Sequence, residues 1–133
     1  MSNRWILVLV AFAVLIVSSL GGAIQAHHSR AAYATEEIVL EGVVTQFVWR
    51  NPHIFLMFDV KGDGGEVVRW SGELSAVTSM IAAGLSRDSF KPGDEIRVNA
   101  QAALTGEPFS LLGSIWRGDG TKVLDGDYRT ETR

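Results

Sequence analysis

Several stretches of the chain alternate between apolar and polar residues, which is the period of a β-strand with one buried face. The clearest is 53–60, where Ile54, Leu56 and Phe58 point to one face and the residues between them to the other. β-Branched and aromatic residues are frequent in the other stretches. We therefore predict strands at 37–49, 53–60, 66–73, 96–102 and 109–116, with a brief last strand at 122–124.

Turn-forming residues separate these stretches. Residues 50–52 (Arg-Asn-Pro) are expected to turn, because proline fixes its own φ and restricts the residue before it. A Gly/Asp-rich hairpin turn follows at 61–65. Ser75 is expected to cap a short helix that Gly84 ends, since apolar residues between them recur at helical spacing. Gly42 stands where the first strand would bend or bulge.

The predicted order of elements is strand, strand, strand, short helix, strand, strand. This is the order of an OB-fold, a small Greek-key barrel in which the helix follows the third strand. The sequence thus predicts an all-β protein with one short helix, an OB-fold-like five-stranded Greek-key barrel over 37–124. Residues 27–36 are expected to form an extended arm and residues 125–133 a flexible tail.

The first 26 residues have the three parts of a secretory signal peptide. Arg4 supplies the positive start, an apolar run follows from Trp5, and small residues lead to Ala26. The apolar run is short for a transmembrane helix. We expect cleavage after Ala26, a periplasmic location and no stable membrane insertion afterwards, with an uncleaved amino-terminal anchor as the alternative.

Composition narrows the possible functions. The 15 acidic residues outnumber the 12 basic ones, so the clustered Lys and Arg that bind nucleic acid are not expected. The chain has no cysteine, which excludes disulfides, thiolate metal sites and thiol catalysis. No paired carboxylates or nucleophile motif emerges, so an enzymatic role is the third choice.

The chain's three histidines, His27, His28 and His53, are candidate metal ligands. Cleavage after Ala26 would place a free α-amine beside the His27 imidazole, and these two nitrogens can chelate one ion. Amine and imidazole nitrogens suit Cu(II), and Zn(II) less selectively. His28 and His53 can supply further nitrogens, so the sequence predicts a copper site. The competing interpretation is structural: a polar start to the arm, and a turn capped by His53.

Trp49, Asn51, Trp70 and Glu73 are candidates for contact with a small ligand or a partner protein of the cell envelope. Should Trp49 and Trp70 lie on neighbouring strands, their rings could form an aromatic platform. Packing in the core or at its rim is the competing explanation. The second functional hypothesis is accordingly a non-metal scaffold module that uses a Trp-bearing barrel face.

Five short motifs, taken together, resemble those of a family of small exported bacterial proteins described as a domain of unknown function. They are Ala26-His27-His28-Ser29, Gly42-Val43-Val44, Trp49-Arg50-Asn51-Pro52-His53, Trp70-Ser71-Gly72-Glu73 and Lys91-Pro92-Gly93-Asp94. The resemblance implies a Gram-negative periplasmic setting and a β-barrel-like fold. It brings no established activity, so the functional hypotheses depend on the residues themselves.

Overall fold

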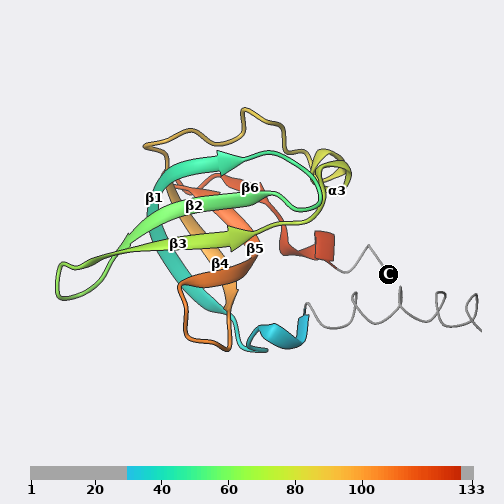
Figure 1. Ribbon diagram of the computed structural model, residues 1–133. Coiled ribbons are helices and arrows are strands. Elements are labelled where there is room, and N and C mark those ends of the chain that lie inside the picture. Colours follow the sequence, from blue (N-terminus) through green and yellow to red (C-terminus); the bar gives the residue numbers. More distant parts are fainter. Residues whose placement is uncertain (1–29, 130–133) are drawn as a thin grey trace, which may run out of the picture. The chain divides into compact units, whose positions relative to one another are not determined.

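The computed structural model describes residues 30–129 (Figure 1). Its strands are β1 (Ile38–Val48), β2 (Phe55–Lys61), β3 (Val67–Glu73), β4 (Glu95–Ala102), β5 (Phe109–Arg117) and β6 (Lys122–Leu124). The α-helix α3 (Val77–Ala82) lies between β3 and β4, and two 3-10 helices, η1 (Arg30–Ala32) and η2 (Gly126–Arg129), are present. The predicted signal peptide lies outside the described residues.

The strands close into a barrel. Their order is β3-β2-β1-β4-β5-β6 with antiparallel neighbours, and β3 also pairs with β5 in parallel, which joins the two sides of the sheet. Following the pairs round gives five strands with α3 after the third, as in an OB-fold. The prediction of a five-stranded Greek-key barrel is confirmed, and α3 lies at the far end of β3 from the β2–β3 hairpin turn (Figure 1).

The alternating apolar and polar residues along 53–60 occupy alternating buried and partly exposed positions. Ile54, Leu56 and Phe58 are each 0% exposed and form part of the barrel's hydrophobic core. Residues between them face outward and are partly exposed. The strand itself begins at Phe55, two residues later than predicted, although Ile54 still exchanges backbone hydrogen bonds with Leu74 and Ser75 (2.8 and 3.2 Å). The chain is therefore held against β3 from Ile54 onward.

β1 bends where its register against β2 shifts, between Val44 and Gln46. The prediction placed this irregularity at Gly42, which serves a different purpose. A Cβ atom on Gly42 would lie 2.6 Å from the carbonyl oxygen of Asp59, so glycine allows close approach of β1 to β2.

One local prediction is wrong. Ser75 does not cap α3, whose N-cap residue is Ala76 and has no side-chain cap hydrogen bond. Within the predicted tail, residues Gly126–Arg129 form η2, and the Gly126 N–H donates to Ser114 Oγ on β5 at 2.9 Å, while residues 130–133 lie outside the described residues. In the predicted arm, Tyr33 forms an isolated bridge with Ala103 at the end of β4, which fixes where the chain enters the barrel.

Among residues 30–129, no helix is long and apolar enough to cross a membrane.

Gly72 lies where β3 and β5 close the barrel, opposite Ser110. A Cβ atom there would lie 2.5–2.6 Å from three side-chain atoms of Leu112, which is 0% exposed. We expect Gly72→Ala to lower the free energy of unfolding by about 1–3 kcal/mol, the usual cost of overpacking a core, in urea denaturation. The neighbouring substitution Ser71→Ala should change it by less than about 0.5 kcal/mol. A Gly72→Ala protein as stable as the wild type would contradict this account of the closure.

Candidate functional site

His53 follows the turn between β1 and β2 and is held by a carboxylate from β3. Phe55 pairs in register with Glu73, so His53 lies close to the carboxyl end of β3. Its Nδ1 contacts Glu73 Oε1 directly. The His53 side chain is 46% exposed and that of Glu73 only 16%, which places the imidazole at the surface and its carboxylate partner beneath it.

The second oxygen of Glu73 accepts a hydrogen bond from Tyr33. The Tyr33 hydroxyl donates to Glu73 Oε2 at 2.7 Å, across 40 positions of sequence. Both carboxylate oxygens are therefore engaged, one by an imidazole and one by a phenol. We refer to this arrangement as the Tyr33–Glu73–His53 chain.

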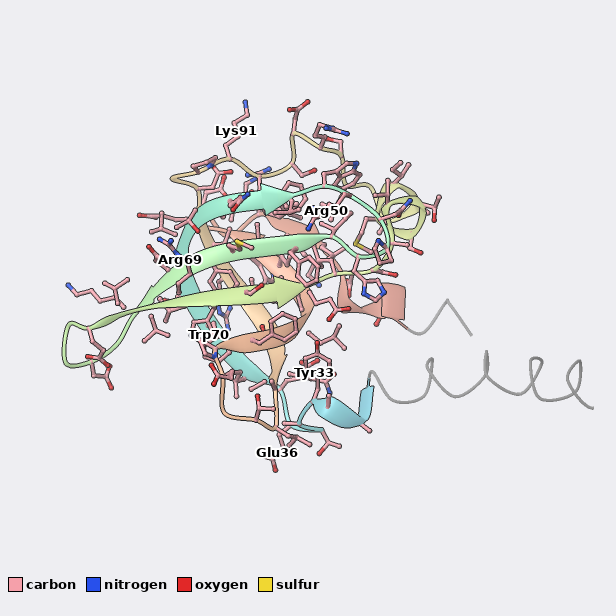
Figure 2. All side chains as sticks on the ribbon, viewed as in Figure 1. Tyr33, Glu36, Arg50, Arg69, Trp70 and Lys91 are labelled. Carbon is pink, nitrogen blue, oxygen red and sulfur yellow. The ribbon has the colours of Figure 1, made fainter. Side chains whose placement is uncertain are left out.

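Tyr33 is fixed by its backbone and by its ring. Beside the bridge to Ala103, the Ala34 N–H donates to the Ala102 carbonyl at 2.8 Å. The phenol stacks on Phe109 of β5 with ring centroids 6.0 Å apart (Tyr33 is labelled in Figure 2). Burial raises the pKa of Tyr33, and its hydrogen bond to the charge of Glu73 raises it further. The hydroxyl consequently stays protonated at neutral pH and remains a donor.

This arrangement suits an imidazole that binds a cation. When a neutral histidine donates its Nδ1–H to a carboxylate, the lone pair of Nε2 points away from that carboxylate. Metal-binding histidines commonly have such a partner, which sets the tautomer and makes the ligand nitrogen more basic. With nearly half of its side chain exposed, His53 is accessible to an ion.

Asn51, a predicted ligand-contact residue, makes a structural contact with the helix α3. Its Oδ1 accepts a hydrogen bond from the Val77 N–H at 3.1 Å, at the start of α3. The missing local cap of the helix is thus supplied from the turn between β1 and β2. The same hydrogen bond links the turn that precedes His53 to the start of α3, which follows Glu73 in the chain.

Trp49 and Trp70 do not lie on neighbouring strands, so the condition for the predicted aromatic platform is not met. Trp49 follows β1 and packs against Phe47, with centroids 5.6 Å apart, while Trp70 is on β3 and β2 lies between. Trp70 pairs in register with the buried Phe58, so it faces the interior. Both rings are partly buried against the core.

A third tryptophan, Trp116, lies in a surface groove of about 530 Å³. Arg97 and Lys122 approach its ring to 5.5 and 5.4 Å from the centroid. The groove runs over β1, β4 and β5 and is lined by Glu41, Gly42, Val43, Glu95, Ile96, Arg97, Trp116, Arg117, Gly118 and Gly120. It shares no lining residue with the Tyr33–Glu73–His53 chain.

No cluster of three or more histidine or acidic side chains able to hold a metal ion occurs within residues 30–129. His53 and Glu73 form a pair there. The other two predicted ligands, His27 and His28, lie outside the described residues.

Tyr33 is the member of the site that the sequence did not reveal. It is the single aromatic residue between His27 and Thr35, and nothing in the local pattern links it to a carboxylate 40 positions away. Glu73 is among the predicted contact residues, but the sequence does not predict its contacts with Tyr33 and His53. The contact between them arises from barrel closure, which local periodicity does not encode.

The described residues define a five-stranded OB-type barrel that carries a carboxylate-held histidine at its surface. The chain belongs to the family of unknown function DUF6152, whose model matches residues 14–111. This range contains all three histidines together with Tyr33 and Glu73, and it confirms the predicted membership of a family of unknown function. Neither the curated proteins nor the solved structures contained a match to the chain.

The Asn51 contact with α3 can be tested by stability. Asn51→Ala removes the acceptor of the Val77 N–H, and we expect the free energy of unfolding to fall by about 0.5–2 kcal/mol, as for loss of a helix cap. Asn51→Asp keeps an acceptor oxygen and should stay within about 0.5 kcal/mol of the wild type. Equal stability of all three proteins in urea denaturation would show that the contact does not hold the turn.

Proposed function

We propose that this chain is a periplasmic metal-binding protein whose ion is Cu(II). His53 supplies one imidazole nitrogen, and His27 supplies its imidazole and the α-amine created by cleavage after Ala26. His28 is a further nitrogen donor. The proposal is for binding of the ion and assigns no catalytic step to it.

The orientation of His53 is the observation that carries this proposal. Its Nδ1 contacts the carboxylate of Glu73, and the carboxylate is itself fixed by the Tyr33 hydroxyl at 2.7 Å. An imidazole needed merely as a polar surface residue requires neither partner. One held in this way has its Nε2 lone pair oriented in advance, which lowers the ordering cost of binding an ion.

The donor set favours copper. The chain contains no cysteine, so soft thiolate ligands cannot contribute. Amine and imidazole nitrogens bind Cu(II) most strongly among the divalent first-row metals, and they bind Zn(II) more weakly. Copper is therefore the proposed ion and zinc the second.

The second candidate function is a non-metal binding module of the cell envelope. The supporting observation is the groove beside Trp116, whose lining combines an aromatic ring with both acidic and basic side chains. Such a lining suits a small polar ligand or a segment of a partner protein better than an ion. This candidate replaces the Trp49 and Trp70 platform of the sequence hypothesis.

Calorimetric titration of Cu(II) into the exported protein tests the metal proposal, after intact mass has established whether His27 is the first residue. We expect His53→Ala to weaken binding at least about tenfold, equivalent to about 1.4 kcal/mol. Glu73→Gln should weaken it in the same direction, because second-shell changes typically cost about 10–100-fold in affinity. Arg69→Gln is the matched control, since it removes an exposed ion pair with Asp59 elsewhere on the barrel.

Unchanged Cu(II) affinity in His53→Ala would contradict the proposal, because the ion would then be held by the amino-terminal residues alone. A mature protein that begins at another residue would remove the amine ligand. Either result would favour the groove beside Trp116 as the functional surface.

A further inference from the structure

We infer that the chain forms a twofold-symmetric dimer through residues 67–69 of β3, which pair antiparallel with the same residues of a second copy. The inference is independent of the proposed metal site, because it uses no residue of the Tyr33–Glu73–His53 chain. It concerns the part of β3 whose outer edge is unpaired within residues 30–129.

The outer edge of β3 is open along its first half. β2 pairs with β3 over the whole strand, whereas β5 pairs with it only from Ser71 to Glu73. The earlier residues belong to the β2–β3 hairpin, which projects beyond the neighbouring strands (Figure 1). A strand edge of this kind presents backbone donors and acceptors to which another strand can pair.

Hydrogen bonds on either side of this segment show which backbone groups face outward. The Glu66 carbonyl accepts from the Gly62 N–H at 2.8 Å, so Glu66 faces β2. The Ser71 N–H donates to the segment before β5 at 3.0 Å, so Ser71 faces away from β2. Backbone groups of successive strand residues point to alternate sides. Val67 and Arg69 therefore direct their N–H and C=O groups away from β2, where the described residues place no partner strand.

This edge lacks the protection that edge strands usually have. Natural edges repel a second strand with charged side chains, proline or a β-bulge. Residues 67–69 contain no proline, and their register against β2 is regular. The one charged side chain, Arg69, donates to both carboxylate oxygens of Asp59 on β2, at 2.8 and 3.0 Å (Arg69 is labelled in Figure 2). Its neighbours Val67 and Val68 are 63% and 39% exposed.

One symmetric antiparallel register satisfies all the outward groups. With Val68 on the twofold axis, Val67 lies opposite Arg69 of the second copy, and each such pair exchanges two backbone hydrogen bonds. Placing Arg69 on the axis would set two arginines opposite each other, which is destabilising, and would require the Ser71 N–H, which is already bonded. Placing Val67 on the axis would require Gly65, whose N–H is bonded within the hairpin turn.

The apolar side chains also fit this register. Val68 shares a face with Trp70 and pairs with Val60, and both of these residues pack against the core. On the axis the two Val68 side chains would lie directly opposite each other, and such cross-strand contacts stabilise a sheet. The edge is self-complementary in hydrogen bonding, charge and packing, which identifies a second copy as its partner. A contact of this isologous kind closes at two chains.

Sedimentation equilibrium of the exported, processed protein over a concentration series tests the inference. We expect a monomer–dimer equilibrium that Val67→Pro weakens at least about tenfold, equivalent to about 1.4 kcal/mol. Proline removes one outward N–H from each chain and is tolerated where the N–H of an edge strand faces solvent. Val67→Ala is the matched control, because it keeps both backbone groups and should weaken association much less.

Disulfide trapping tests the register and does not depend on the folding of the proline variant. The chain has no cysteine, so Val68→Cys introduces a single one. In the proposed dimer the two Cα atoms at this position are about 4.5 Å apart, as in any non-hydrogen-bonded pair, and a disulfide can bridge them. In a glutathione redox buffer we expect a covalent dimer from Val68→Cys and far less from Val67→Cys, although Val67 is the more exposed residue.

Three results would overturn the inference. They are a wild type that remains monomeric up to about 1 mM, a dimer that Val67→Pro leaves unchanged, and a Val68→Cys protein that cross-links no more readily than Val67→Cys. None of these results bears on Cu(II) binding by His53. Failure of the dimer and failure of the proposed function are therefore distinguishable.

Discussion

The carboxylate of Glu73 is the contact on which the candidate site depends. With a side chain only 16% exposed, it would lose favourable hydration without compensation unless donors replaced the water. His53 and Tyr33 are those donors, and they come from the turn before β2 and from the segment before β1. One partly buried carboxylate thus determines where an exposed imidazole lies and where the preceding segment joins the barrel.

Barrel closure is what places Glu73 there. Its backbone lies between Phe55 of β2 and Leu111 of β5, so the end of β3 is paired on both sides. Side chains alternate between the two faces of a strand, and a slip of one residue would turn Glu73 into the core. The contact of Gly72 with Leu112 limits such a slip, because this inward position has no room for a larger residue. Core packing and site geometry are therefore determined by adjacent residues of one strand.

The sequence was informative about elements and much less informative about contacts between them. Periodicity predicted the strands, their order and the inward face of β2, because these depend on neighbouring residues. It placed the helix cap on Ser75, the nearest suitable side chain, whereas the donor at Val77 is satisfied by Asn51, 26 positions earlier. The aromatic platform required Trp49 and Trp70 to lie on neighbouring strands, whereas β2 lies between β1 and β3. The contact of Tyr33 with Glu73 joins residues 40 positions apart that barrel closure brings together. Local spacing cannot reveal such a contact.

The Tyr33–Glu73–His53 chain joins a neutral hydroxyl donor, a carboxylate and an imidazole. Tyr33 is held in its neutral form, since burial and the neighbouring carboxylate raise its pKa, so it donates a hydrogen bond without supplying charge. The ion-pair partner of Glu73 is His53. A hydrogen bond to an ionised group is stronger than one between two neutral groups, so the carboxylate holds Nδ1 and leaves Nε2 as the remaining ring nitrogen. Proton and metal compete for that one nitrogen, because only deprotonated Nε2 binds an ion. The carboxylate therefore occupies Nδ1 of His53 and leaves Nε2 as the nitrogen through which the proposed metal site would bind its ion.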